Sequence, residues 1–231
     1  MNIKLAYEDE HILVCVKPSG IATQTAKTTV QDMVSLIKNY LVQKGASRNP
    51  YLGVVHRLDQ PVSGLLVFAK TQKAAATLSK QLQGEAANKE YLALCLGHLP
   101  SPEGKLIHYL KKDRSSNQAV VTGAQDKEGK YAELSYRVED QRENSSLLSI
   151  RLKTGRFHQI RAQFLAAGNP LLGDRKYKTE ESEKESLRQQ IGSVALCANG
   201  LSLIHPITGK PMNFTLDRED LPLWYKRGRE M

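Results

Sequence analysis

The stretch from Val54 to Lys70 constrains the fold of this 231-residue chain more than any other. Its apolar beginning is followed by a Pro-x-Ser-Gly turn, and residues 65–69 then form a continuous apolar run typical of a buried strand. This pattern predicts two short strands joined by a polar loop. Asp59 lies on that loop, so we expect its carboxylate at the edge of a rigid core, where packed backbone on both sides would aim it. Read alone, the same Asp is also typical of an ordinary surface turn.

Composition and charge narrow the class of protein. Apolar residues make up 40% of the chain and charged residues 25%, which is typical of a globular protein. The formal charge of +9 favours a polyanionic partner, although a basic surface kept for solubility remains an alternative. Three widely spaced cysteines are expected to be buried reduced thiols, because they fit neither a zinc site nor a disulfide framework: Cys15, Cys95 and Cys197.

The ends and connections of the chain predict a soluble cytoplasmic protein with one domain. The N-terminus lacks the apolar segment of a signal peptide, and no apolar stretch approaches the length of a transmembrane helix. We find neither an internal repeat nor a linker that would separate independent domains. Residues 1–231 are therefore expected to form a single domain.

The first half of the chain alternates strands and helices. Residues 3–16 predict a β-hairpin, followed by a Lys-Pro-Ser-Gly turn that begins at Lys17. Thr28 or Thr29 is expected to cap a helix whose buried stripe includes Val30, and Thr71 is expected to cap a second helix. A strand over residues 89–96 follows. Its alternation places Tyr91 on the face opposite Leu92, Leu94 and Leu96, so Tyr91 is not required in the core.

Residues 105–152 contain closely spaced strand-like runs separated by polar turns. They predict a large, mainly antiparallel mixed sheet flanked by helices and loops, and therefore an α+β protein. Basic residues crowd the turns of this region, where they form either a solvated face or an RNA contact: Lys111, Lys112, Arg114, Lys127 and Lys130.

Later segments predict a helix and a hairpin. A turn at Thr154 and Gly155 is expected to begin a helix that ends at Gly168, with Phe157 in its buried stripe and with His158 and Arg161 on a neighbouring face. The backbone N–H groups at its start could meet a phosphate. Residues 179–190 predict a solvated connection or short exposed helix, and the Asn-Gly pair at 199–200 predicts a hairpin turn.

Three motifs together resemble the pseudouridine synthases of the ribosomal large subunit synthase A type. They are His-Arg-Leu-Asp with the following Ser-Gly-Leu-Leu-x-Phe-Ala-Lys, then Leu-x-Thr-Gly-Arg-x-His-Gln-Ile-Arg, and then Asn-Pro-Leu-Leu-Gly-Asp-x-x-Tyr at 169–177. The resemblance covers about residues 3–217 and implies the pseudouridine synthase fold. The chain departs from the family pattern at Val62, Lys178 and Cys197, where Thr, Gly and His are common. Many relatives carry a small N-terminal RNA-binding domain, which this chain is expected to lack.

The resemblance implies an isomerase that converts a uridine in ribosomal or transfer RNA to pseudouridine without cofactor or metal. It assigns Asp59 as the nucleophile, which attacks ribose C1′ or uracil C6 or assists loss of the base. It places Arg161 beside this carboxylate to keep it ionised, and Tyr91 against the target base, where the hydroxyl helps to remove the C5 proton. It also implies that Arg57 fills the stack vacated by the flipped uridine.

Further expectations concern binding and competing functions. Lys17, Lys112, Arg156 and His158 are expected to contact RNA, and the protein is expected to be a monomer. His56 is expected to make a structural hydrogen bond at a strand end. A metal-dependent phosphodiesterase built on His56, Asp59 and His158 is one alternative, disfavoured because no dense cluster of ligands is present. A non-catalytic RNA-binding module is the other, but it gives no reason for an Asp in a basic groove.

Overall fold

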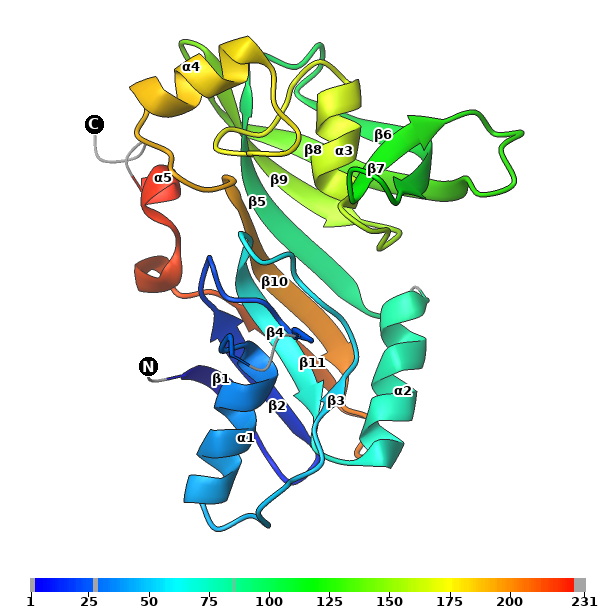
Figure 1. Ribbon diagram of the computed structural model, residues 1–231, viewed down its shortest axis with the longest axis vertical. Helices are drawn as coiled ribbons and strands as arrows, with labels where there is room; N and C mark the ends of the chain where they lie inside the picture. The colour runs from blue at the N-terminus through cyan, green and yellow to red at the C-terminus, as the bar shows by residue number, and fades with distance from the viewer. Residues whose placement is uncertain (1–2, 27–28, 85, 227–231) are drawn as a thin grey trace. The chain divides into compact units, whose positions relative to one another are not determined.

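A computed structural model of the chain describes residues 3–26, 29–84 and 86–226 (Figure 1). The chain divides into two compact units. Unit 1 contains residues 1–88 and 198–216, and unit 2 contains residues 89–197 and 217–231. Unit 1 is therefore built from two segments that are separated in sequence by most of unit 2.

The sheet of unit 1 has the strand order β1-β2-β4-β10, with β11 paired to β10 and β3 paired to β4. Its strands are β1 Lys4–Glu8, β2 Ile12–Lys17, β3 Gly53–Val54, β4 Ser63–Ala69, β10 Leu196–Ile204, which belongs to this unit from Ala198 onward, and β11 Pro211–Thr215. β2 and β4 pair antiparallel through Val14 and Val67, and both strands are almost fully buried. The predicted N-terminal hairpin and the two strands around Asp59 are confirmed.

A glycine is required at the start of β4. Gly64 has a φ of +124°, and a Cβ placed on it would lie 2.2 Å from the carbonyl oxygen of Ala198. Any larger residue would therefore push β4 away from β10 as well as strain the backbone. Gly64 is therefore required for β4, the strand that follows the Asp59 loop, to begin in its position beside β10.

The two helices of unit 1 differ in how well their beginnings were predicted. Helix α2, Gln72–Gln83, begins as expected, because the Thr71 side chain accepts a hydrogen bond from Ala74 N. Helix α1, Met33–Gln43, begins later than expected. Asp32 caps it in a reciprocal capping box with Ser35, which is a stronger cap than a lone threonine, and Val30 lies outside the helix and is exposed. The prediction of Thr29 as cap is wrong, and Thr28 lies outside the described residues.

Asp9 links the first hairpin of unit 1 to its last turn. Its carboxylate accepts hydrogen bonds from the backbone N–H groups of His11 and Ile12 at 2.7 and 2.8 Å. The same side chain lies 2.8 Å from Nε2 of the buried His205, which is 196 positions later in the chain. The turn between β1 and β2 is therefore held by a residue at the end of β10.

The predicted hairpin at Asn199 and Gly200 is wrong. β10 runs without a turn through both residues, and Gly200 pairs with Thr215 of β11. An Asn-Gly pair favours a turn only where the chain can reverse there. Here pairing with neighbouring strands over five registered positions outweighs the local preference.

The sheet of unit 2 has the strand order β5-β9-β8-β6-β7, and each of these pairs is antiparallel. The strands are β5 Asn88–Leu96, β6 Glu103–Asp113, β7 Gln118–Thr122, β8 Lys130–Arg142 and β9 Ser145–Leu152. The predicted α+β class with mainly antiparallel pairing is confirmed.

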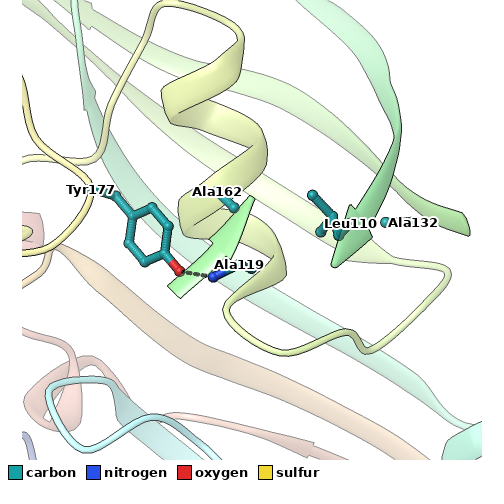
Figure 2. Close-up of a cluster of buried hydrophobic side chains, with 5 residues drawn as sticks. All are labelled: Leu110, Ala119, Ala132, Ala162 and Tyr177. Carbon is teal, nitrogen blue, oxygen red and sulfur yellow. Dashed lines mark hydrogen bonds between the residues drawn. The ribbon is translucent and has the colours of Figure 1, made fainter. Parts of the chain in front are cut away.

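Helix α3, Gln159–Ala166, packs on β6 and β7 of this sheet. Figure 2 shows the small cluster beneath it, in which Tyr177 lies among buried aliphatic side chains and its hydroxyl accepts a hydrogen bond of 2.6 Å from Ala119 N. The remaining helices of the unit are α4 Glu180–Arg188, a 3₁₀ turn at Arg218–Asp220 and α5 Leu223–Lys226. Among the described residues, no helix is long and apolar enough to cross a membrane.

The sequence predicted helix α4 in part and the burial of the cysteines correctly. The charged segment after Thr179 is a helix, as one of its two interpretations proposed, but Ser182 and Glu185 are buried rather than solvated. The cysteines are buried thiols outside any disulfide, which confirms the prediction. Burial raises the pKa of Cys15 and of Cys95 to about 12, so these thiols are protonated at neutral pH.

Candidate active site

Asp59 lies in unit 1 on the turn that joins β3 to β4. The carbonyl oxygen of Asp59 accepts a hydrogen bond of 3.0 Å from Val62 N, which closes the turn. Asp59 itself is half-buried, whereas Leu58 and Val62 on either side are buried. The turn is therefore anchored to the core by its flanking residues, as the apolar pattern around it predicts.

A second segment, residues 17–23, braces the Asp59 turn. The Thr23 hydroxyl donates to Leu58 O at 3.0 Å and accepts from Leu58 N at 3.1 Å. Gly20 N donates to Gln60 O at 2.9 Å, and Gln60 Nε2 donates back to Gly20 O at 3.0 Å. Sequence reasoning missed the roles of Thr23 and Gln60. The only signal was the Lys-Pro-Ser-Gly turn, which indicated a bend but not its partner.

Lys17 has a different role from the RNA contact expected of it. Its side chain is fully buried, and its ammonium donates to three backbone carbonyls, those of Pro18 at 2.9 Å, Ile21 at 2.6 Å and Gln60 at 3.0 Å. An ammonium has three N–H bonds, so these contacts account for all of them. Burial lowers the pKa of Lys17 to about 8, while the negative charge of Asp59 acts in the opposite direction. Lys17 therefore places a buried positive charge next to the backbone of the Asp59 turn.

His56 and Arg57 precede Asp59 and face different surroundings. His56 Nε2 accepts a hydrogen bond of 3.1 Å from Val67 N, so the expected structural hydrogen bond is confirmed. Because this nitrogen accepts, it carries no proton in that arrangement. Arg57 is exposed, as a residue that reaches into an RNA stack must be.

Arg161 lies in unit 2 on α3 and forms a buried ion pair with Asp174. Nε and Nη2 of Arg161 donate to the two carboxylate oxygens of Asp174 at 2.6 and 2.8 Å, and both side chains are nearly inaccessible to solvent. Asp174 also accepts from the backbone N–H groups of Lys176 and Tyr177. The guanidinium lies over the Tyr177 ring, 4.9 Å from its centroid. Asp174 therefore fixes the plane of Arg161.

Asp174 was not assigned a role from the sequence. It belongs to the Gly-Asp-x-x-Tyr motif, but its partner is 13 residues earlier and on another element. A buried acid requires a paired cation, but the motif alone shows neither the burial of Asp174 nor its partner.

Tyr91 lies on β5 in register with Ile150 of β9. The alternation left Tyr91 outside the core, but the structure buries it to 7% exposure together with its neighbours on both faces, from Leu92 to Cys95. β5 therefore has no solvated face at this point. A mostly buried tyrosine has few accessible orientations.

The segment before α3 corrects two expectations. The helix begins at Gln159 rather than near Gly155, because His158 takes a left-handed conformation with φ of 50°. The Gln159 side chain holds this turn by accepting from Thr154 Oγ1 at 2.8 Å and from Arg156 N at 2.9 Å. Phe157 therefore precedes the helix and is 40% exposed rather than part of its buried stripe.

The structure brings His158 and Lys112 together around Phe157. The His158 and Phe157 rings stack with centroids 3.7 Å apart, and Lys112 Nζ lies 4.6 Å from the Phe157 centroid. His158 Nδ1 lies 2.8 Å from the Tyr177 hydroxyl. Arg156 is exposed, and its Nε donates to Tyr131 O at 2.8 Å. These expected RNA contacts of unit 2 are thus neighbours on one surface.

Potential metal ligands gather at a different point in the chain. Within the part of the chain that the structure describes, the one group of three such side chains is Asp217, Glu219 and Asp220, on the 3₁₀ turn. It contains none of the residues from which a phosphodiesterase site was considered. Exposed acidic groups of this kind are common without a metal.

A comparison of the sequence with known families now identifies the class. The family described as RNA pseudouridylate synthase matches residues 11–166, which include the braced turn of Asp59, β5 with Tyr91 and the whole of α3 with Arg161. The chain therefore belongs to this family, whose members are isomerases that act on uridine in RNA.

Individual relatives agree with this assignment. The chain is 35% identical over 232 residues to the ribosomal large subunit pseudouridine synthase D of Zymomonas mobilis, covering 97% of this chain and 72% of that protein. It is 34% identical over 214 residues to the ribosomal large subunit pseudouridine synthase C of Escherichia coli K12, covering 90% of this chain and 64% of that protein. The chain thus spans less than two thirds of the length of the second of these relatives.

Solved structures show the same fold. A human structure titled RNA Pseudouridylate Synthase Domain Containing 4 superimposes with a TM-score of 0.78, covering 96% of this chain and 90% of that chain at 19% identity. The human structure of RNA Pseudouridylate Synthase Domain Containing 1 gives a TM-score of 0.75 at 20% identity, covering 96% of this chain and 85% of that chain. The expected pseudouridine synthase fold is confirmed.

Proposed function

We propose that this chain isomerises a uridine in RNA to pseudouridine, with Asp59 as the nucleophile. The observation that carries the proposal is the braced Asp59 turn, which lies in the family match and is held by Thr23, Gln60 and the buried Lys17. A carboxylate fixed in this way needs no ordering when substrate arrives. The reaction breaks the N1–C1′ bond, turns the uracil and joins C5 to the same sugar carbon, so it is redox-neutral.

Arg161 and Tyr91 would complete the chemistry. Arg161, whose plane is fixed by its two hydrogen bonds to Asp174, is assigned the role of favouring the ionised form of Asp59. Tyr91 would lie against the target base and help to remove the C5 proton. In this proposal residues 1–231 act as one catalytic domain.

Arg57 would occupy the place of the target uridine after it leaves the stack. Extrusion costs on the order of a few kcal/mol, which contacts with the RNA must offset. The exposure of Arg57 next to the Asp59 turn supports this role. Arg57→Ala should therefore lose less activity on an RNA whose uridine is already unstacked than on one whose uridine is stacked. Equal losses on both RNAs would contradict the role.

Large-subunit ribosomal RNA is the proposed substrate, because the names of the relatives given above specify the ribosomal large subunit. The test compares large-subunit ribosomal RNA transcripts with transfer RNA transcripts, each labelled with tritium at uracil C5. Tritium release from ribosomal RNA alone would support the proposal, and release from transfer RNA alone would reassign the substrate.

Asp59→Asn tests the nucleophile. The amide keeps the shape of the side chain but cannot form the covalent bond, so tritium release should fall by at least about 10³-fold while RNA affinity stays within a few-fold. Glu180→Gln, an acid-to-amide change on the exposed surface of α4, is the matched control and should keep full activity. If RNA binds to the wild-type protein but never releases tritium, the chain is a non-catalytic RNA-binding module.

A further inference from the structure

The exposed ring of Phe157 is unlike the other phenylalanines of the chain. The sequence has four, of which Phe68 and Phe164 are fully buried and Phe214 is partly buried, whereas Phe157 is 40% exposed. Leaving an aromatic ring in water forfeits the free energy of its burial, so an exposed ring in a structured segment is a candidate for a binding surface.

The ring of Phe157 is held rigidly from one side. His158 stacks on one face at a centroid distance of 3.7 Å and an interplanar angle of 20°. His158 is itself fixed by Tyr177, whose hydroxyl contacts His158 Nδ1 and accepts from Ala119 N. Tyr177 is fully buried, and Figure 2 shows it among the side chains under α3. A ring supported in this way loses little conformational entropy when a ligand stacks on it.

An exposed cation, Lys112, also lies over the ring of Phe157. Because His158 fills one face, the ammonium of Lys112, 4.6 Å from the centroid, lies over the opposite face. Lys112 is exposed, and a cation over an aromatic ring at an exposed site is weakly held. A flat ligand could therefore replace the ammonium at low cost. The displaced lysine would remain within reach of an anionic group attached to that ligand.

The charges around the ring indicate which flat ligand this is. Lys112, Arg156 and Lys176 are exposed cations on the neighbouring segments, and Lys176 Nζ contacts Asn117 O beside β7. The nearest acid on the same turn is Asp113, whose carboxylate accepts hydrogen bonds from Ser115 and Ser116. A flat aromatic ring with a negative charge attached describes a nucleotide.

We infer that Phe157, backed by His158, is a stacking platform for an unpaired nucleobase of the bound RNA other than the target uridine, with Lys112 moving from the ring to an adjoining phosphate. The inference rests on the proposed function in that it takes RNA as the ligand. It adds a second contact that recognises single-stranded character and tolerates any base, because every base has a π-face.

The test measures the affinity of the full chain for a short single-stranded RNA of about ten nucleotides. Phe157→Leu keeps an apolar side chain but removes the ring, and should weaken binding by about 5- to 30-fold without altering the salt dependence. Phe157→Tyr keeps the ring and should bind like wild type. Leu187→Ala, which removes another exposed apolar side chain from unit 2, is the matched control and should change nothing.

Two further measurements keep the inference testable if Phe157→Leu proves unstable. The fluorescence of Phe157→Trp should be quenched on addition of the RNA. Scanning an abasic nucleotide along the RNA should identify one position where wild-type binding weakens but Phe157→Leu binding does not weaken further. Equal affinity of folded Phe157→Leu and wild type, an unquenched Trp, or no such position would each overturn the platform.

The outcomes separate the platform from the catalytic proposal. If wild-type protein releases no tritium from any RNA but its affinity depends on Phe157 as described, the platform stands and the catalytic proposal fails. If tritium is released normally and affinity does not depend on Phe157, the platform fails alone. A docking site for another protein would appear as the second of these outcomes.

Discussion

Lys17 in unit 1 and Arg161 in unit 2 are both buried cations, but their surroundings differ. Lys17 is surrounded by three neutral carbonyls, and burial lowers its pKa to about 8. Arg161 is paired through two hydrogen bonds with a buried carboxylate. A lysine ammonium held by carbonyls can lose its proton, whereas a guanidinium cannot in a protein. The charge of Lys17, next to the Asp59 turn, can therefore change with pH, whereas the charge of Arg161 on α3 is permanent.

The largest expected effect concerns the carboxylate of unit 2. Asp174→Asn removes the buried charge that binds the guanidinium of Arg161 through two hydrogen bonds, so the free energy of unfolding should fall by about 3–5 kcal/mol. Urea denaturation measures this loss, and Glu180→Gln at an exposed ion pair should lose less than about 1 kcal/mol. A loss below 1 kcal/mol for Asp174→Asn would mean that the pair is not the main constraint on Arg161.

Arg161→Lys is expected to affect turnover more than stability. The ammonium keeps the charge but lacks the planar fork that contacts both oxygens of Asp174. We expect tritium release to fall by about 10²-fold at saturating RNA, with RNA affinity nearly unchanged. An unchanged rate would show that Arg161 serves only to pair with Asp174.

Lys17→Met should have a smaller effect on stability than Asp174→Asn. The change removes three hydrogen bonds but also removes the cost of burying a charge, so we expect a loss of about 1–3 kcal/mol in the free energy of unfolding. Turnover should fall as well, because Gln60 loses one of its braces beside Asp59. Equal stability with a normal rate would show that Thr23 and Gly20 hold the turn without Lys17.

The smallest expected effect is on the pH dependence of stability, which should differ between the surroundings of Lys17 and those of Arg161. Because the pKa of Lys17 is near 8 in the folded chain and 10.5 in the unfolded chain, the unfolded state binds more protons between these values, and stability from this group rises with pH. The difference between wild type and Lys17→Met should grow by about 1 kcal/mol from pH 7 to pH 9. Asp174→Asn should lose the same amount at both pH values. A constant difference for Lys17→Met would mean that the three carbonyls keep the pKa of Lys17 near its ordinary value.

The sequence predicted the elements whose signals are local. The hairpin of residues 3–16, the cap at Thr71 and the antiparallel strands between residues 103 and 152 follow from alternation, capping and turn residues, and they formed as expected. The errors fall where a distant partner outweighs a local preference. β11 keeps Asn199 and Gly200 extended, and the left-handed His158 shortens α3 and exposes Phe157.

The candidate site was predicted in its residue types but not in its supports. The motifs indicated Asp59, Tyr91 and Arg161, and these assignments stay predictions. Thr23, Gln60 and Asp174 act through hydrogen bonds across 13 to 40 positions of sequence, which periodicity does not detect. Lys17 was expected to contact RNA, which needs an exposed side chain. Its burial depends on carbonyls supplied by two separate turns.

The contact between Asp9 and His205 has a consequence for synthesis of the protein. A ribosome synthesises the first hairpin long before it adds β10, His205 and β11. In the finished unit, His205 contacts Asp9 in the first hairpin, and β10 pairs with β4. Unit 2, which lies almost wholly between the two segments of unit 1, can acquire its local antiparallel contacts while unit 1 is still incomplete. The nascent chain therefore carries the apolar strands β2 and β4 unfinished through most of translation, which is the interval in which a chaperone would bind them.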